Sequence, residues 1–426
     1  MLDQEITTAI MKAVDAGFEE QIELTAELVR FPSVRGAEHT AQDFIAAEMV
    51  CRGLAVDRFQ INIDDIRNLP GFSPVHVNYD NAFNVVGCQR ANSPKGRSLI
   101  LNGHIDVVPA GPLDMWTTPP FQPRRDAGWL YGRGAGDMKA GLAGCLGALA
   151  ALARIGYRPA ADVIVQSVVE EECTGNGALA CLARGYRADA VLIPEPMEDR
   201  LIRAEVGVLW FQVQVRGIPV HVREAGSGAN AIEAAYGLMQ ALHRLEDEWN
   251  GRREAYPPFE QVEHPINLNI GKIAGGDWPS SVPAWCSFDV RIAIYPGQSI
   301  EAAKREIEQT ILAAARQNRF LDNYPPAIVY HGFEAEGYVL TGAEEPVAKL
   351  GDAHRAVFGR ALEERAVTFT TDARFFVLYA GIPALVYGPN SEAIHGFDER
   401  VDLESVRRIT QAMTLFIADW CGLEKR

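Results

Sequence analysis

Three adjacent acids follow an apolar run in the middle of the chain. Residues 163–169 are almost wholly apolar, and Glu170, Glu171 and Glu172 come directly after them, before the turn CTGNG. Three neighbouring negative charges repel one another, so we expect a cation or a bound proton close by. A solvated acidic turn would have the same composition. The buried character of the preceding run favours a pocket at the carboxyl end of a strand instead.

Other residues suited to metal binding lie where further strands are predicted to end. His104 and Asp106 close the run SLILNGHID, and a metal-binding histidine usually donates its second ring N–H to a carboxylate or carbonyl oxygen. Glu195 stands between two prolines after AVLIP, and His395 follows the strand ALVYG. Asp137 lies in the glycine-rich loop GRGAGDMKAG just before a predicted helix. Each signal taken alone also fits an ordinary polar loop.

Together, these residues suit a site for two divalent metals. Two imidazoles and three carboxylates could hold two ions that share one carboxylate, with the candidates being His104, Asp137, Glu171 or Glu172, Glu195 and His395. One of the adjacent glutamates could bind metal while the other acts on the attacking water as a general base. A phosphate-binding interpretation of GRGAG is weaker, because Asp137 would meet phosphate with the wrong charge and no GK[ST] follows.

The elements that must position these residues change along the chain. Up to residue 207 helical and strand patterns alternate, as in a sheet with helices on both faces. Residues 208–336 read β-α-β-β-α-β, the order of a ferredoxin-like α+β unit. The α/β pattern resumes over 337–426. We therefore predict an α/β catalytic domain formed by 1–207 and 337–426 and interrupted by a smaller α+β domain.

Composition excludes several classes of partner. The formal net charge of −16 makes nucleic acid and anionic membranes poor partners, because their phosphates would be repelled. The N-terminal segment lacks the basic and apolar regions of a secretory signal. Seven cysteines without a CxxC pair fit reduced thiols. We expect a cytoplasmic protein that binds neither nucleic acid nor membrane.

Several motifs, in one order and spacing, resemble a known family. GHIDVVPAG, GRGAGDMKAG, EEECTGNGA, PEP and AIHGFDERV resemble the M20 metallopeptidase/deacylase family, and within it the acetylornithine deacetylase and succinyl-diaminopimelate desuccinylase type. The resemblance extends from about residue 24 to the C-terminus. It implies a zinc-exopeptidase-like α/β catalytic domain interrupted by a ferredoxin-like lid and dimerisation domain.

The resemblance also implies roles for the acidic and imidazole residues. It assigns five residues to two divalent ions, zinc first with cobalt or manganese as alternatives: His104 with Glu195, Glu172 with His395, and Asp137 between them. Asp106 would orient His104, and Glu171 would be the general base. Glu170 would take the place of an aspartate in the family pattern. All three acids of the turn would then face the two metals and one water.

Two further residues in the lid are implied by the resemblance. His221 in RGIPVHVREAG matches a lid histidine that reaches the partner's active site in dimeric members and stabilises the oxyanion; on its own it would be an ordinary strand-end histidine. Arg291 in FDVRIAIYPG matches an arginine that contacts a substrate carboxylate. Val206, Ser280 and Ala284 depart from the family pattern, which affects substrate details rather than the metal site.

The implied activity is that of a di-metal amidohydrolase. It would remove an acetyl, formyl or succinyl group from an N-acylated amino acid or a similar small amine, and would form a homodimer through the lid. The alternative is a metal-dependent carboxypeptidase or dipeptidase of the same family. A non-catalytic binding protein of this fold would lack a ligand or the base, and none is missing here.

Overall fold

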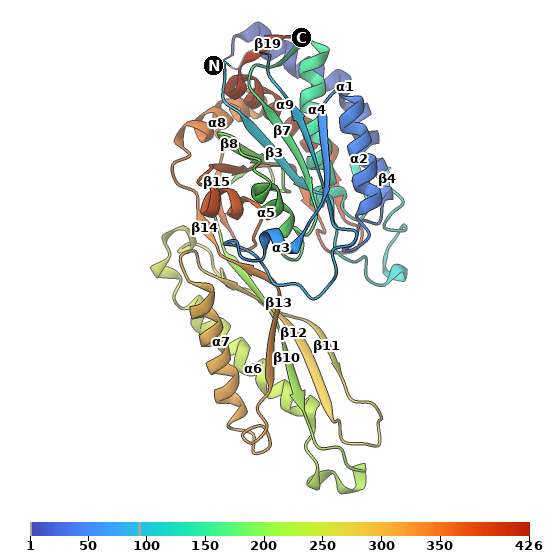
Figure 1. The fold of residues 1–426 in the computed structure, drawn as a ribbon, viewed down its shortest axis with the longest axis vertical. Helices are drawn as coiled ribbons and strands as arrows, with labels where there is room; N and C mark the ends of the chain where they lie inside the picture. Colours follow the sequence, from blue (N-terminus) through green and yellow to red (C-terminus); the bar gives the residue numbers. More distant parts are fainter. Residues whose placement is uncertain (1, 93–94) are drawn as a thin grey trace.

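The computed structural model describes residues 2–92 and 95–426, and its larger part is built on one six-stranded sheet (Figure 1). In spatial order the strands are β1 (Ala55–Gln60), β2 (Phe83–Gln89), β7 (Val163–Val168), β3 (Leu99–His104), β8 (Ala190–Ile193) and β16 (Ala384–Val386). The last four are parallel, and β1 and β2 form an antiparallel edge. Every residue of β7 and β3 is buried, as expected for parallel strands covered on both faces.

Helices cover both faces of this sheet, as predicted. They are α1 (Gln4–Arg30), α2 (His39–Cys51), α3 (Ile63–Ile66), α4 (Ala140–Arg154), α5 (Asn176–Ala183), α8 (Glu344–Phe358) and α9 (Leu403–Cys421). Asn84 and Gly87 of β2 point to opposite faces because they are three residues apart. Gly87 lies against Met49 of α2, whereas the Asn84 side chain donates to the Gly177 carbonyl of α5.

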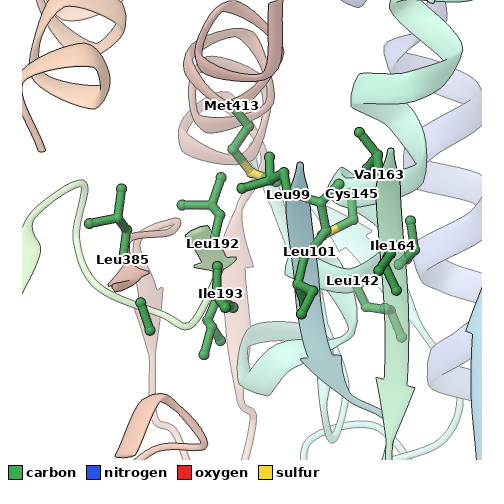
Figure 2. Close-up of a cluster of buried hydrophobic side chains, with 14 of the residues drawn as sticks. Leu99, Leu101, Leu142, Cys145, Val163, Ile164, Leu192, Ile193, Leu385 and Met413 are labelled. Carbon is green, nitrogen blue, oxygen red and sulfur yellow. The ribbon is translucent and has the colours of Figure 1, made fainter. Parts of the chain in front are cut away.

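The buried side chains of the sheet fix where its strands end. Figure 2 shows the cluster in which leucines, isoleucines and valines of β3, β7, β8 and β16 meet Leu142 and Cys145 of α4 and Met413 of α9. Each fully buried Leu or Ile contributes about 1.5–3 kcal/mol relative to exposure. A slip of one residue in any strand would turn these side chains to the wrong face, so the polar residues after each strand are held in register.

A second, antiparallel sheet extends away from the first (Figure 1). Its elements are β10 (Gly207–Arg216), α6 (Ala231–Asn250), β11 (Leu268–Gly275), β12 (Trp285–Ile294), α7 (Ile300–Ala315) and β13 (Ala327–Ala335). The spatial order β11-β12-β10-β13 is that of a ferredoxin-like sheet, which confirms the predicted topology. We propose 208–336 as the extent of this domain, which we call the lid. The helices cover one face, and the other face is open.

Three small sheets complete the structure. One contains β14 (Tyr338–Val339), β9 (Leu201–Glu205) and β15 (Glu364–Val367); another contains β17 (Ser391–Glu392), β18 (Arg400–Asp402), β5 (Trp129–Tyr131) and β4 (Arg124–Asp126); the third pairs β19 (Leu423–Lys425) with β6 (Tyr157–Pro159). The second of these sheets joins the segment around His395 to the segment before Asp137. Among the described residues no helix is long and apolar enough to cross a bilayer, and all seven cysteines are free.

Candidate metal centre and active site

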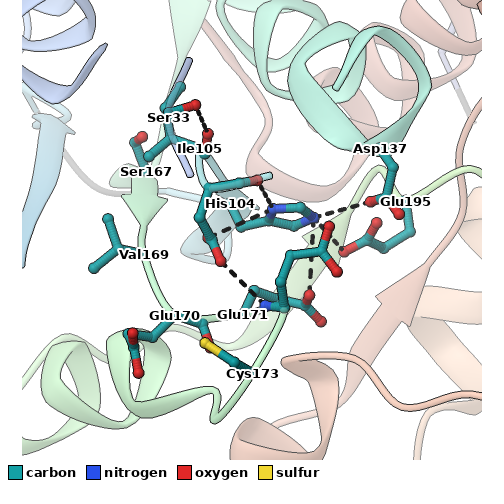
Figure 3. Close-up of polar contacts among 12 residues, drawn as sticks. Ser33, His104, Ile105, Asp137, Ser167, Val169, Glu170, Glu171, Cys173 and Glu195 are labelled. Carbon is teal, nitrogen blue, oxygen red and sulfur yellow. Dashed lines mark hydrogen bonds and ion pairs between the residues drawn. The ribbon is translucent and has the colours of Figure 1, made fainter. Parts of the chain in front are cut away.

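The carboxyl ends of three neighbouring parallel strands bring the predicted residues together. His104 is the last residue of β3, and the acidic turn follows β7 on one side while Glu195 follows β8 on the other. Figure 3 shows Glu171, Glu195 and Asp137 arranged around the His104 ring. Because parallel strands end at one edge of a sheet, this is where an open α/β sheet places a ligand.

One imidazole is surrounded by three carboxylates. His104 Nε2 lies 3.0 Å from Asp137 Oδ1, 3.8 Å from Glu195 Oε1 and 3.9 Å from Glu171 Oε2. The His104 side chain is only 1% exposed. Distances of this size leave room for one small cation between the imidazole and the carboxylates.

The second imidazole reaches the same aspartate from the other side. His395 Nε2 lies 3.4 Å from Asp137 Oδ2 and 3.0 Å from Glu172 Oε2. The two oxygens of Asp137 therefore face different imidazoles, which is the arrangement of a carboxylate shared by two ions. Ligand atoms of His104, Asp137 and Glu172 all lie within 4.8 Å of one another.

The charges of this cluster fit divalent cations. Burial by itself lowers the pKa of His104, but the hydrogen bond to Asp137 and the nearby carboxylates outweigh burial and raise that pKa well above its usual value. Burial lowers the pKa of His395 too, yet Glu172 and Asp137 raise it to about 11. Burial, with Glu195 as the next cause that raises it, lifts the pKa of Glu171 far above its usual range. Several buried carboxylates lie close together here, and a cation among them would offset their mutual repulsion. The mixed nitrogen and oxygen donor set suits zinc.

Asp106 contacts both His104 and the backbone of Glu172. His104 Nδ1 lies 2.9 Å from the Asp106 backbone oxygen and 3.6 Å from its carboxylate Oδ1. A proton on Nδ1 donates to that carbonyl and leaves the Nε2 lone pair facing Asp137, which is the tautomer a metal ligand needs. The carboxylate Oδ2 accepts from the Glu172 backbone N–H at 3.1 Å. Asp106 is thus placed to position His104 and Glu172 together.

The expectation that all three acids of the turn face the metals is wrong for Glu170. Its carboxylate accepts two hydrogen bonds from Arg35, at 2.5 and 2.7 Å, and a third from the Tyr79 hydroxyl at 2.5 Å. Glu170 also adopts a positive φ of 71°, which is uncommon for a residue other than glycine. The guanidinium of Arg35 offsets this one charge of the triplet, while Glu171 and Glu172 face the site.

A buried ion pair that the sequence did not reveal supports Asp137. Glu399 Oε1 accepts from the backbone N–H groups of Gly136 and Asp137 at 2.9 and 3.1 Å, and Glu399 Oε2 lies 2.5 Å from Arg133 Nη1. Arg133 Nη2 donates to the Gly396 carbonyl, next to His395. The pair therefore ties the Asp137 loop to the His395 loop. The available signal was a charged residue four positions from a predicted ligand in each motif.

The sequence and the fold of this chain are similar to those of known proteins. Residues 100–419 match the model of peptidase family M20/M25/M40. The chain belongs to this family. Two relatives, from Halalkalibacterium halodurans and Bacillus subtilis, are 29% and 28% identical over the full length of both chains, and each is named N-formyl-4-amino-5-aminomethyl-2-methylpyrimidine deformylase. The solved structure of the di-peptidase Dug1p from Saccharomyces cerevisiae is similar in fold, with a TM-score of 0.78 at 16% identity, covering 97% of this chain and 98% of that one.

The predicted lid residues lie in different places in this M20 protein. His221 is exposed, precedes the short helix η3 (Val222–Ser227), and pairs with Ser281 in the segment between β11 and β12. Within one chain it does not join the metal cluster. Its proposed role therefore depends on a second subunit.

Arg291 of β12 does lie near the cluster. It lines a cavity of about 440 Å³ together with Asp106 and Glu172, a size suited to a small substrate. Two of its nitrogens donate to the Asn267 and Thr368 carbonyls, and burial lowers the pKa of Arg291 to about 10. No carboxylate pairs with it among the described residues, so it keeps donors for a ligand.

Proposed function

We propose that this protein is a metal-dependent amide hydrolase that removes a formyl group from a small N-formylated amine. The observation that carries the proposal is one cluster of side chains beside the carboxyl ends of β7, β3 and β8. The cluster contains His104, Asp137, Glu171, Glu172 and His395. Family membership supports hydrolysis of an amide. The names of the two full-length relatives favour formyl over acetyl or succinyl.

Two divalent ions, with zinc as the first expectation and cobalt or manganese as alternatives, fit the donor set. His104 and Glu195 would hold one, Glu172 and His395 the other, and Asp137 would serve both. When bound, such ions polarise the amide carbonyl and make water more acidic. Asp106 positions this set by holding the His104 tautomer and the Glu172 backbone.

We assign the proton transfer to Glu171. Its carboxylate takes a proton from the attacking water as the water oxygen bonds to the formyl carbon. The same carboxyl then gives that proton to the amine nitrogen as the C–N bond breaks, which releases formate and the free amine. The burial of Glu171 keeps bulk water away from this transfer.

We further propose a homodimer through the lid, in which His221 of one subunit assists the other subunit's site. The lid carries exposed apolar side chains, Trp278, Tyr236 and Ile273 among them, that support an interface. The seven free thiols fit a reducing cytoplasm.

The test is free-amine release from N-formyl, N-acetyl and N-succinyl amino acids, N-formyl aminomethylpyrimidine and several dipeptides. Each substrate is assayed with zinc, with cobalt and with chelator, beside Glu171→Ala as the blank. We expect chelator-sensitive cleavage of formamides. Arg291 suits a carboxylate-bearing substrate, so turnover of dipeptides with formamides untouched would transfer the protein to the carboxypeptidase or dipeptidase alternative.

A further inference from the structure

The open face of the lid sheet forms one wall of the substrate cavity. Cross-strand register places Asn269, Arg291 and Trp210 side by side in one row on β11, β12 and β10. In the next row Lys272 and Gln212 flank Asp289. The cavity is lined by the first row and by Lys272 and Asp289, and on its other side by Asp106 and Glu172.

Asp289 is an acid that the metal site does not use. Its Oδ1 accepts from Gln212 Nε2 at 2.7 Å and lies 3.9 Å from His331 Nε2. Oδ2 has no hydrogen-bond partner among the described residues, and Lys272 forms no ion pair with it. Apart from the metal-side residues Asp106 and Glu172, it is the one carboxylate among the described residues that line the cavity.

One aromatic side chain of the lid sheet, that of Trp210, lines the cavity one row away from Asp289. The indole of Trp210 packs on Gly332, where a Cβ would come within 2.5 Å of the ring, and meets Phe333 edge-on at a centroid distance of 5.2 Å. Trp210 is therefore held in place. A flat ring lying along this wall would bury apolar surface while its polar edge met the free carboxylate oxygen.

We propose that Asp289 is the specificity-determining residue that binds the leaving amine, and that it selects a heteroaromatic amine carrying adjacent nitrogen donors. The inference rests on the proposed function, because it places the scissile formamide at the metal-side residues. The edge of a 4-aminopyrimidine, an exocyclic NH₂ beside a ring nitrogen, offers such donors when that nitrogen is protonated. A carboxylate accepts two parallel hydrogen bonds from that edge, and each oxygen has a second lone pair, so Gln212 need not be displaced.

The test compares two formamides of similar size. N-formyl-4-amino-5-aminomethyl-2-methylpyrimidine has the donor edge, whereas N-formylbenzylamine has the same scissile bond and a ring without donors. Asp289→Asn keeps an oxygen for Gln212 and removes the charge; the side chain is about a quarter exposed, so folding is not at risk. Asp322→Asn, an exposed acid elsewhere in the lid, is the matched control.

We expect the ratio of kcat/KM for the pyrimidine to that for the benzylamide to fall about 10- to 100-fold in Asp289→Asn. The ratio should not change in Asp322→Asn. A ratio within threefold of wild type in Asp289→Asn, with both formamides still hydrolysed, would overturn the inference and leave the proposed function standing.

A binding measurement distinguishes the role of Asp289 in amine binding from the proposed deformylase activity. Calorimetry with the amine product, 4-amino-5-aminomethyl-2-methylpyrimidine, and metal-loaded protein should show Kd weakened about 10- to 100-fold in Asp289→Asn. If wild type binds the amine in this Asp289-dependent way yet cleaves neither formamide, the proposed function fails and the binding role survives. Equal Kd values would refute the role of Asp289 whatever the turnover.

Discussion

Glu399→Gln should destabilise the protein and weaken its metal site together. The side chains of Arg133 and Glu399 are 2% and 1% exposed, so the substitution leaves a buried guanidinium without its counter-charge. Breaking a buried pair in this way costs about 3–5 kcal/mol. The backbone N–H groups of Gly136 and Asp137 would also be held by a weaker, uncharged acceptor. Looser support of Asp137 should reduce metal affinity about 10- to 100-fold.

The assay is equilibrium urea unfolding of chelator-treated protein, followed by circular dichroism, so that metal binding does not contribute to the measured free energy. Zinc affinity is then measured on refolded samples by competition with a chelating dye. Glu19→Gln is the control, because the Glu19–Arg125 pair is largely exposed and should contribute less than about 1 kcal/mol. Glu399→Gln within about 1 kcal/mol of wild type, with unchanged zinc affinity, would refute the positioning role of this pair.

Three other variants test separate parts of the account. Glu171→Ala should bind its full complement of metal, measured by elemental analysis, and lose kcat by about 10²- to 10⁴-fold, because only the proton transfer is removed. Glu172→Ala should instead bind less metal, and two tightly held ions in that variant would show that the two roles are exchanged. Burial raises the pKa of Glu205 from its ordinary 4.5 to about 8, so folding favours its protonated form. The wild-type free energy of unfolding should therefore fall, relative to Glu205→Gln, as pH rises from about 5 to 8, and parallel curves in urea titrations at several pH values would contradict this.

The sequence predicts strand ends better than it predicts side-chain directions. Apolar runs locate β3, β7 and β8, and parallel pairing then brings His104, the acidic turn and Glu195 to one edge, so the cluster follows from local patterns. The order of the lid strands likewise follows from alternation and helix spacing.

Local sequence patterns do not predict contacts between residues that are far apart in the chain. Glu170 looks identical to its two neighbours in the sequence, and its direction depends on Arg35, 135 residues away. Glu399 and Arg133 are 266 residues apart and meet because β18 pairs with β5. The local pattern shows only that each is a charged residue four positions from a predicted ligand, and this does not reveal that the two pair.

Titration of metal-free enzyme with zinc tests the central claim most directly. Chelator-treated protein would receive increasing zinc while formate release from an N-formyl aminomethylpyrimidine is followed, with Glu171→Ala in parallel. We predict no turnover without metal, a rise that reaches its plateau near two equivalents per chain, and no rise in the variant. Full activity in the presence of chelator, or equal formate release by wild type and Glu171→Ala, would contradict a metal-dependent deformylase built on this site.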